Sequence, residues 1–155
     1  MAEEPAVLIR HGRADEGDRL KAIAIASKGF WGYEPERVRA WADQGDFTPA
    51  ALAALALFVG ECDGVPIAWA SVELRDEVAW LADLWVEPEW IGKGVGRRLF
   101  RRAAEHARLS GARAMEWEAE ANAVGFYEKV GAREVREGAS EWGRTLSVMR
   151  VELDA

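Results

Sequence analysis

The sequence predicts an α/β fold, in which a mixed sheet is flanked by helices within a single domain spanning residues 1–155. Three observations lead to this prediction. The 155 residues suit one hydrophobic core, and 50% of them are hydrophobic. Strand-like and helix-like segments follow one another without a repeat or a low-complexity linker. Residues 78–120 read as strand, helix and strand, an order that makes two parallel strands joined by a right-handed crossover.

The strands are predicted from short apolar runs bounded by turn residues. The clearest pair flanks Asp63-Gly64, a dipeptide favoured in tight hairpin turns, and Pro88 closes a later strand. The predicted strands lie at 7–10, on both sides of the turn within 55–74, and at 78–88, 112–120, 132–137 and 144–153. The expected sheet therefore has about six to seven strands and is mostly antiparallel.

The helices are predicted where apolar residues recur at helical spacing. Asp15 and Thr48 are the predicted N-caps, and Gly29 is predicted to end the first helix. The predicted helices cover 14–29, 35–45, 95–109 and 122–131, with one more helical turn from Pro49 and an aromatic loop at 30–33. The apolar face of the helix at 95–109 consists of Val95, Leu99, Ala103 and Ala107.

Composition excludes several classes of function. The chain carries a formal net charge of −7, which argues against general nucleic-acid binding because phosphate repels it. No stretch reaches the ~18 apolar residues of a membrane span, and residues 1–10 lack the features of a signal peptide. Cys62 is the only cysteine, so no internal disulfide can form. These features predict a cytoplasmic protein that does not interact with membranes.

The segment EWIGKGVGRRLF, residues 89–100, places glycines at 92, 94 and 96 between a predicted strand and a predicted helix. Backbone N–H groups at a helix start bind anions, and glycine lets a ligand approach the backbone closely. Between Lys93 and Arg108, six basic residues and one acidic residue give a local charge of +5. Both features favour a phosphate or pyrophosphate, although a tight turn before a solvated arginine face gives the same pattern.

Two segments resemble the motifs of the GNAT (Gcn5-related N-acetyltransferase) superfamily. Residues 84–100, LWVEPEWIGKGVGRRLF, resemble the acetyl-coenzyme A signature Q/R-x-x-G-x-G/A, which follows a strand ending in V-x-P. Residues 120–135, EANAVGFYEKVGAREV, resemble the C-terminal acetyl-CoA motif of the family. The two motifs come in the family's order and at a suitable separation. The resemblance covers nearly the whole chain in its order of elements.

The first motif matches with one departure. Val86 and Pro88 match the lead-in, and Gly94 and Gly96 match the two fixed small positions. Ile91 stands where the family usually has Gln or Arg. The departure removes one side-chain contact, whereas the backbone amides that would bind a pyrophosphate are unaffected.

The resemblance implies the GNAT fold, with a splayed parallel pair of strands at the acetyl-CoA site, and direct acetyl transfer to a primary amine without a metal. The backbone of Leu84 and Val86 would pair with the pantetheine arm, and the amides of the glycine segment would hold the pyrophosphate. Tyr127 would donate a proton to the departing thiolate. The implied cofactor-binding residues are Leu84, Trp85, Val86, Ile91, Gly92, Lys93, Gly94, Val95, Gly96, Arg97, Arg98 and Asn122.

The acceptor side is less defined. The base that removes the proton of the amine has four candidates, each of which also fits an exposed strand carboxylate: Asp83, Glu73, Glu118 and Glu120. Asp83 is favoured because it lies on the strand expected beneath the thioester. The predicted acceptor-binding residues are Phe30, Trp31, Tyr33 and Glu118, an aromatic and acidic set that suits a cationic amine with an apolar body.

Two functions from other classes compete with the enzyme. A GNAT-fold protein that only senses or scaffolds with acyl-CoA is favoured by the departure at Ile91, whereas Tyr127 favours the enzyme. A basic-helix nucleic-acid binder is disfavoured by the net charge and by the lack of aromatic residues among the arginines. The closing strands at 133–137 and 144–153 are candidates for a homodimer contact.

Overall fold

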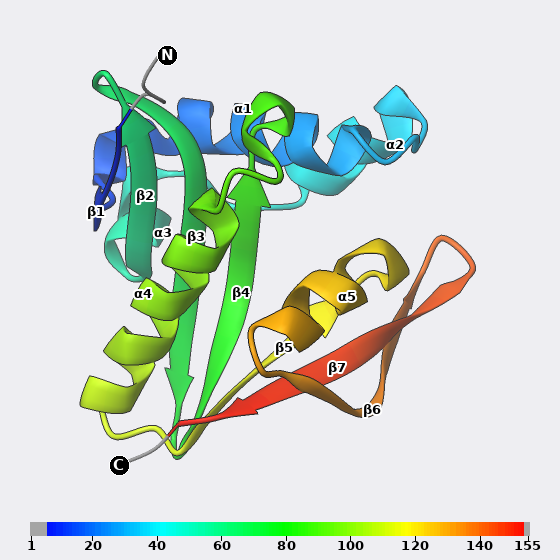
Figure 1. Cartoon of the computed structure of the whole chain (residues 1–155). Helices are drawn as coiled ribbons and strands as arrows, with labels where there is room; N and C mark the ends of the chain where they lie inside the picture. Colours follow the sequence, from blue (N-terminus) through cyan, green and yellow to red (C-terminus); the bar gives the residue numbers. More distant parts are fainter. Residues whose placement is uncertain (1–5, 154–155) are drawn as a thin grey trace, which may run out of the picture. The chain divides into compact units, whose positions relative to one another are not determined.

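A computed structural model describes residues 6–153 and contains a seven-stranded mixed sheet flanked by helices (Figure 1). The strand order is β1-β2-β3-β4-β5-β7-β6, with β4 and β5 parallel. The strands are β1 (Val7–His11), β2 (Ala56–Cys62), β3 (Val65–Arg75), β4 (Val78–Val86), β5 (Ala114–Ala119), β6 (Arg133–Glu141) and β7 (Arg144–Glu152). The helices are α1 (Gly17–Gly29), α2 (Pro35–Asp43), α3 (Pro49–Ala53), α4 (Val95–Leu109) and α5 (Ala121–Lys129), with 3-10 turns η1 (Ala14–Glu16) and η2 (Pro88–Trp90). The predicted α/β class and parallel pair are confirmed.

The chain forms two compact units. The first contains residues 6–71 and 83–103, and the second contains residues 72–82 and 104–153. The prediction of a single domain stays a prediction.

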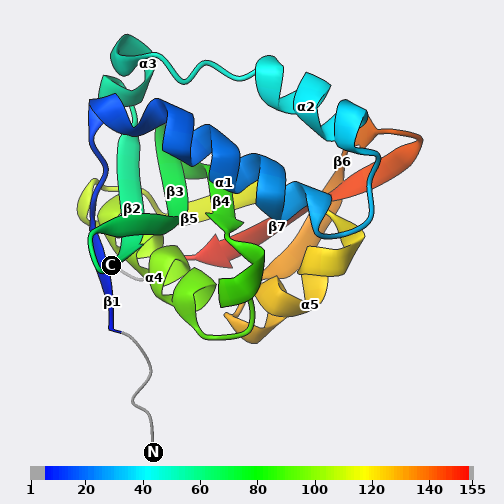
Figure 2. The ribbon, with the colours of Figure 1, turned by 90° about the horizontal axis from the view of Figure 1, so that it is seen from above.

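In the first unit, α1 lies on one face of β2 and β3 and the start of α4 lies on the other (Figures 1 and 2). Alternate side chains of β2 point to opposite faces of the sheet. Leu57 and Val59 pack in a core cluster with Leu20 and Ile23 of α1, all at most 5% exposed. On the opposite face, a Cβ at Gly60 would lie 3.4 Å from Val95 Cγ1. The burial of both faces explains why β2 reads as an almost continuous apolar run.

In the second unit, β7 pairs antiparallel with β5 on one side and with β6 on the other. Trp142 and Gly143 join β6 to β7 with φ values of 51° and 78°. Left-handed backbone at both positions matches the twist of a tight hairpin. Trp117 of β5 packs against Tyr127 of α5, with ring centroids 4.9 Å apart. This aromatic contact fixes α5 on its face of β5.

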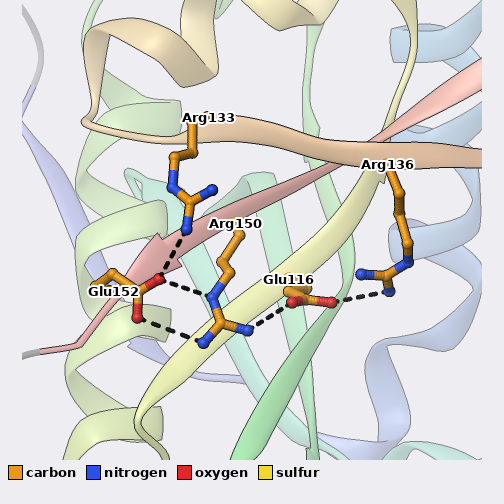
Figure 3. Close-up of polar contacts among 5 residues, drawn as sticks. All are labelled: Glu116, Arg133, Arg136, Arg150 and Glu152. Carbon is orange, nitrogen blue, oxygen red and sulfur yellow. Dashed lines mark hydrogen bonds and ion pairs between the residues drawn. The ribbon is translucent and has the colours of Figure 1, made fainter.

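The other face of the second unit carries a ladder of ion pairs (Figure 3). Glu116 is 7% exposed, and its carboxylate accepts hydrogen bonds from Arg136 at 2.9 Å and Arg150 at 2.7 Å. Burial raises the pKa of Glu116, but the hydrogen bonds from Arg150 and Arg136 outweigh it, and the pKa lies below its ordinary value. Glu152 continues the ladder to Arg150 at 2.8 Å and to Arg133 at 3.3 Å.

Two predicted helix caps have different outcomes. Thr48 is confirmed as a cap, because its Oγ accepts from the Ala51 N–H at 3.3 Å. The prediction for Asp15 is wrong, because Asp15 lies within η1 and α1 begins only at Gly17. The cause is Glu16, whose carboxylate accepts from the Arg13 N–H at 2.8 Å and pairs with Arg10 at 2.7 Å. This capping box tightens the start of the segment into a 3-10 turn.

Candidate active site

The glycine turn, residues 91–96, connects η2 to α4 within the first unit. Gly92 and Gly94 have φ values of +83° and +85°, a backbone conformation that residues with a Cβ rarely adopt. A Cβ built on either glycine would meet nothing within 4 Å. Glycine is therefore needed here for backbone conformation, and the space beside the backbone is open to a ligand.

Backbone N–H groups converge at the start of α4. Arg98 N–H donates to Gly94 O at 3.2 Å, the i to i−4 bond with which the helix begins. The amides of residues 94–97 therefore precede the helical hydrogen-bond ladder, where the helix dipole also favours an anion. The Lys93 N–H donates to Trp90 O at 3.4 Å, so the turn offers fewer amides than its length suggests.

The strand that leads into this turn has an edge of its own. The pairing of β4 with β5 covers Val78–Trp80, whereas β4 continues to Val86. Just beyond the strand, the Glu87 N–H donates to Ile67 O on β3 at 2.9 Å. Because successive N–H groups point to opposite edges of a strand, those of Leu84 and Val86 point away from β3. The Val86 N–H donates to Ser27 Oγ of α1 at 3.4 Å.

The basic residues after the turn differ in their surroundings. Lys93 Nζ lies 5.2 Å from the ring centroid of Trp90. Arg98 donates to the carbonyl of Val7 at 2.8 Å and so attaches α4 to β1. Arg97 is exposed. Of the three cations predicted to meet phosphates, Arg98 therefore has an additional structural function that the sequence did not indicate.

Other members of the positive segment have local partners. Arg108 pairs with Glu105 at 2.7 Å. Arg102 lies 3.4 Å from His11 Nε2, and its guanidinium lies 5.2 Å from the ring centroid of Phe58. Several cations of this segment therefore make local contacts along α4, and much of the local charge of +5 does not lie at the start of the helix.

Asp83, the favoured base, lies on β4 in the first unit. Its Oδ2 accepts from Ser71 Oγ at 2.6 Å, and its Oδ1 accepts from Trp85 Nε1 at 3.1 Å. Ser71 is completely buried, and Asp83 is half-buried. The two donors fix the orientation of the carboxylate.

The other base candidates lie in the second unit. Glu73 pairs with Arg75 at 2.8 Å. Glu118 is exposed and accepts from the Ala139 N–H at 3.3 Å. Because Glu118 follows Trp117 on β5, it lies on the face opposite to Trp117 and Tyr127. The structure therefore does not bring Glu118 together with the predicted acid.

Tyr127 is 8% exposed and packs between Trp117 and Phe126, whose ring centroids lie 4.9 and 5.1 Å away. Burial raises its pKa well above the ordinary value, with a smaller contribution from the charge of Glu120. The phenol therefore stays protonated at neutral pH and is a weaker acid than free tyrosine. Asn122 lies exposed in the first turn of α5.

The predicted acceptor aromatics divide into two groups. Phe30 and Trp31 are 52% and 45% exposed and pack edge to face with centroids 4.9 Å apart. Tyr33 instead lies near Lys28, whose Nζ is 5.9 Å from its ring centroid. Sequence reasoning missed Ser27 and Lys28, because neither residue belongs to a motif and only the packing of α1 brings them to β4.

Residues 6–153 contain no group of three or more His, Cys, Asp or Glu side chains placed to hold a metal ion. In the same part of the chain, no helix is long and apolar enough to cross a membrane.

Comparisons with known proteins identify the family of the chain. Residues 20–132 match the acetyltransferase (GNAT) family. An uncharacterized N-acetyltransferase of Methanocaldococcus jannaschii is 33% identical over 97 residues, which cover 56% of this chain and 42% of that protein. The chain thus matches less than half the length of this relative.

Solved structures share the fold. A GCN5-related N-acetyltransferase from Rhodopseudomonas palustris is 26% identical and superposes with a TM-score of 0.79 over 99% of this chain and 98% of that one. The PaiA N-acetyltransferase of Thermoplasma acidophilum, solved with coenzyme A, is 18% identical and has a TM-score of 0.80 over 95% of this chain and 99% of that one. The chain belongs to the acetyltransferase (GNAT) family.

Proposed function

We propose that the protein is an acetyl-CoA-dependent N-acetyltransferase that transfers the acetyl group directly to a primary amine. The observation that supports this best is the continuity of backbone donors in the first unit. The outward amides of Leu84 and Val86 lead into the open glycine turn and the start of α4. Coenzyme A contains amides in its pantetheine arm and a pyrophosphate beyond it. It therefore needs strand N–H groups followed by N–H groups at a helix start.

The cofactor would be bound mainly by the backbone. The amides of residues 94–97 would receive the pyrophosphate, and Lys93 and Arg97 would supply charge at its solvent side. The pantetheine arm would take the Val86 N–H from Ser27, whose bond of 3.4 Å is long for an N–H donor. Asn122 is assigned to the cofactor by the resemblance alone.

Asp83 would take the proton from the acceptor ammonium, because its carboxylate is held at the strand that would carry the thioester. The neutral amine would then attack the thioester carbon, and the Leu84 N–H would donate to the developing oxyanion. As the C–S bond breaks, Tyr127 would give its proton to the thiolate, a function that the resemblance assigns, and the second proton lost by the attacking nitrogen would restore the phenol. The products are the acetylated amine and free coenzyme A.

The acceptor would meet Phe30 and Trp31, the exposed aromatic pair that follows α1. We further propose a cytoplasmic location, which the single cysteine supports, and we keep the homodimer as a prediction.

The test is thiol release from acetyl-CoA across a panel of primary amines, together with calorimetry for coenzyme A. We expect micromolar to millimolar Michaelis constants for at least one amine. Coenzyme A binding without turnover of any amine would instead identify an acyl-CoA sensor. Absence of coenzyme A binding by the folded protein would remove the glycine turn from the proposal.

A further inference from the structure

Lys28 is a buried cation among aromatic rings. It lies in the last turn of α1 and is 3% exposed. Its Nζ lies 4.4 Å from the ring centroid of Trp41 on α2 and 5.9 Å from those of Tyr33 and Trp85. Trp41 and Trp85 pack edge to face, with centroids 5.0 Å apart. These three rings form an aromatic cage, and the ammonium group that such a cage attracts comes from the chain itself.

The occupied cage changes the expectation for the acceptor. The sequence predicted that the aromatic residues would receive a cationic amine, and Tyr33 was one of them. The structure places the Tyr33 ring in the cage with Lys28, whereas Phe30 and Trp31 form an exposed pair of their own. The aromatic surface left to an acceptor is therefore apolar, with a fixed positive charge close behind it.

The cage includes a residue of the proposed catalytic strand, because Trp85 lies on β4 two residues after Asp83. The indole N–H of Trp85 donates to Asp83 Oδ1 at 3.1 Å. Ser27, the residue before Lys28, accepts the Val86 N–H. One side chain thus separates the ammonium of Lys28 from the carboxylate that is assigned as the base. A second ammonium group close to the reacting amine would have to move from water to a position near Lys28. There the two positive charges repel each other strongly.

We propose that Lys28 determines acceptor specificity by occupying the aromatic cage of Tyr33, Trp41 and Trp85. It excludes amines that carry a second ammonium group near the reacting one, and it favours monoamines with an apolar body. This inference rests on the proposed acetyltransferase function. A purely structural function of Lys28 predicts a different result. Loss of packing or of a favourable helix-dipole contact would affect all acceptors alike.

The test compares two acceptors of equal length, butylamine and 1,4-diaminobutane, in the wild type, Lys28→Met and Lys28→Arg. In Lys28→Met the ratio of kcat/KM for the diamine to that for the monoamine should rise at least ~10-fold, because the repulsive charge is gone. Lys28→Arg keeps the charge and should leave the ratio within ~3-fold of the wild type. The ratio does not depend on the fraction of folded enzyme. An unchanged ratio in Lys28→Met overturns the inference while the proposed function stands.

A second measurement does not need turnover. Lys28→Ala empties the cage, so millimolar tetramethylammonium should quench its tryptophan fluorescence and raise its Tm, with no such change in the wild type. Neopentyl alcohol, a neutral molecule of similar shape, is the control and should have little effect on either protein. If no amine is acetylated by the wild type, the proposed function fails. This measurement alone then tests whether Lys28 occupies the aromatic cage. Equal responses of the two proteins to tetramethylammonium would overturn it.

Discussion

The proposed cofactor side and the proposed acceptor side of the first unit are built from different parts of the chain. The cofactor side is backbone, with left-handed glycines at 92 and 94 and open space beside them. The acceptor side is side chain, with Asp83 held by two donors and Lys28 enclosed by three rings. A site made of backbone depends on a few glycines in one short segment. A site made of side chains depends on contacts between segments far apart in the chain.

Replacing Gly94 by Asp should have the largest effect, because a carboxylate would face the pyrophosphate. We expect the Kd for coenzyme A to rise at least ~100-fold. Gly94→Asn is the matched control, since Asn tolerates left-handed backbone and lacks the charge, and its Kd should rise less than ~10-fold. Calorimetry on both folded variants measures this. Equal losses would show that backbone conformation, and not charge, limits binding at this turn.

Asp83→Asn tests the acceptor side with the next largest effect. It keeps the hydrogen-bond geometry at one oxygen and removes the base, so kcat should fall about 100-fold. The Michaelis constant for acetyl-CoA should change little, since the strand backbone is unaltered. Glu73→Gln is the control, because that carboxylate pairs with Arg75 and its loss should leave kcat unchanged. A larger loss in Glu73→Gln than in Asp83→Asn would move the base to the second unit.

Tyr127→Phe tests the proposed proton donor, which belongs to neither side of this comparison. Phe keeps the ring against Trp117, so packing should be conserved. Turnover should fall at least ~10-fold, and coenzyme A affinity should stay within a few-fold. Because burial raises the pKa of Tyr127, its ionisation should not reduce wild-type turnover below about pH 10. Wild-type turnover in the mutant, measured where chemistry limits the rate, would exclude Tyr127 as the acid.

The smallest effect separates two neighbouring arginines. Arg97→Gln should raise the Kd for coenzyme A about fivefold at low salt and weaken its salt dependence. Arg98→Gln should leave the Kd within about twofold but destabilise the fold by about 1 kcal/mol, because the hydrogen bond to Val7 is lost. Titrations at two salt concentrations and thermal unfolding distinguish the variants. If the two arginines exchange these effects, α4 presents the other side of its first turn to the cofactor.

The sequence predicted most of the fold and the glycine turn for the same physical reason. Turn glycines, Asp63-Gly64 and the apolar spacing of α4 act within a few residues of each other, where local geometry decides the structure. Lys28 could not be predicted, because its cage joins residues from α1, α2, the loop between them and β4. The prediction of Asp15 as a helix cap is wrong for a similar reason, since the ion pair with Arg10 of β1 holds Glu16 toward that strand.

The ion-pair ladder of the second unit bears on how its strands find their alignment. Glu116 lies opposite Arg150, and Glu152 lies two residues further along β7. A slip of β7 by one residue would turn Arg150 to the opposite face, and a slip by two in one direction would place Glu152 against Glu116. Two facing carboxylates at a nearly buried position are costly, whereas the native ladder contributes little net stability. The ladder therefore acts mainly by making wrong alignments unfavourable, so that β7 joins β5 in one register.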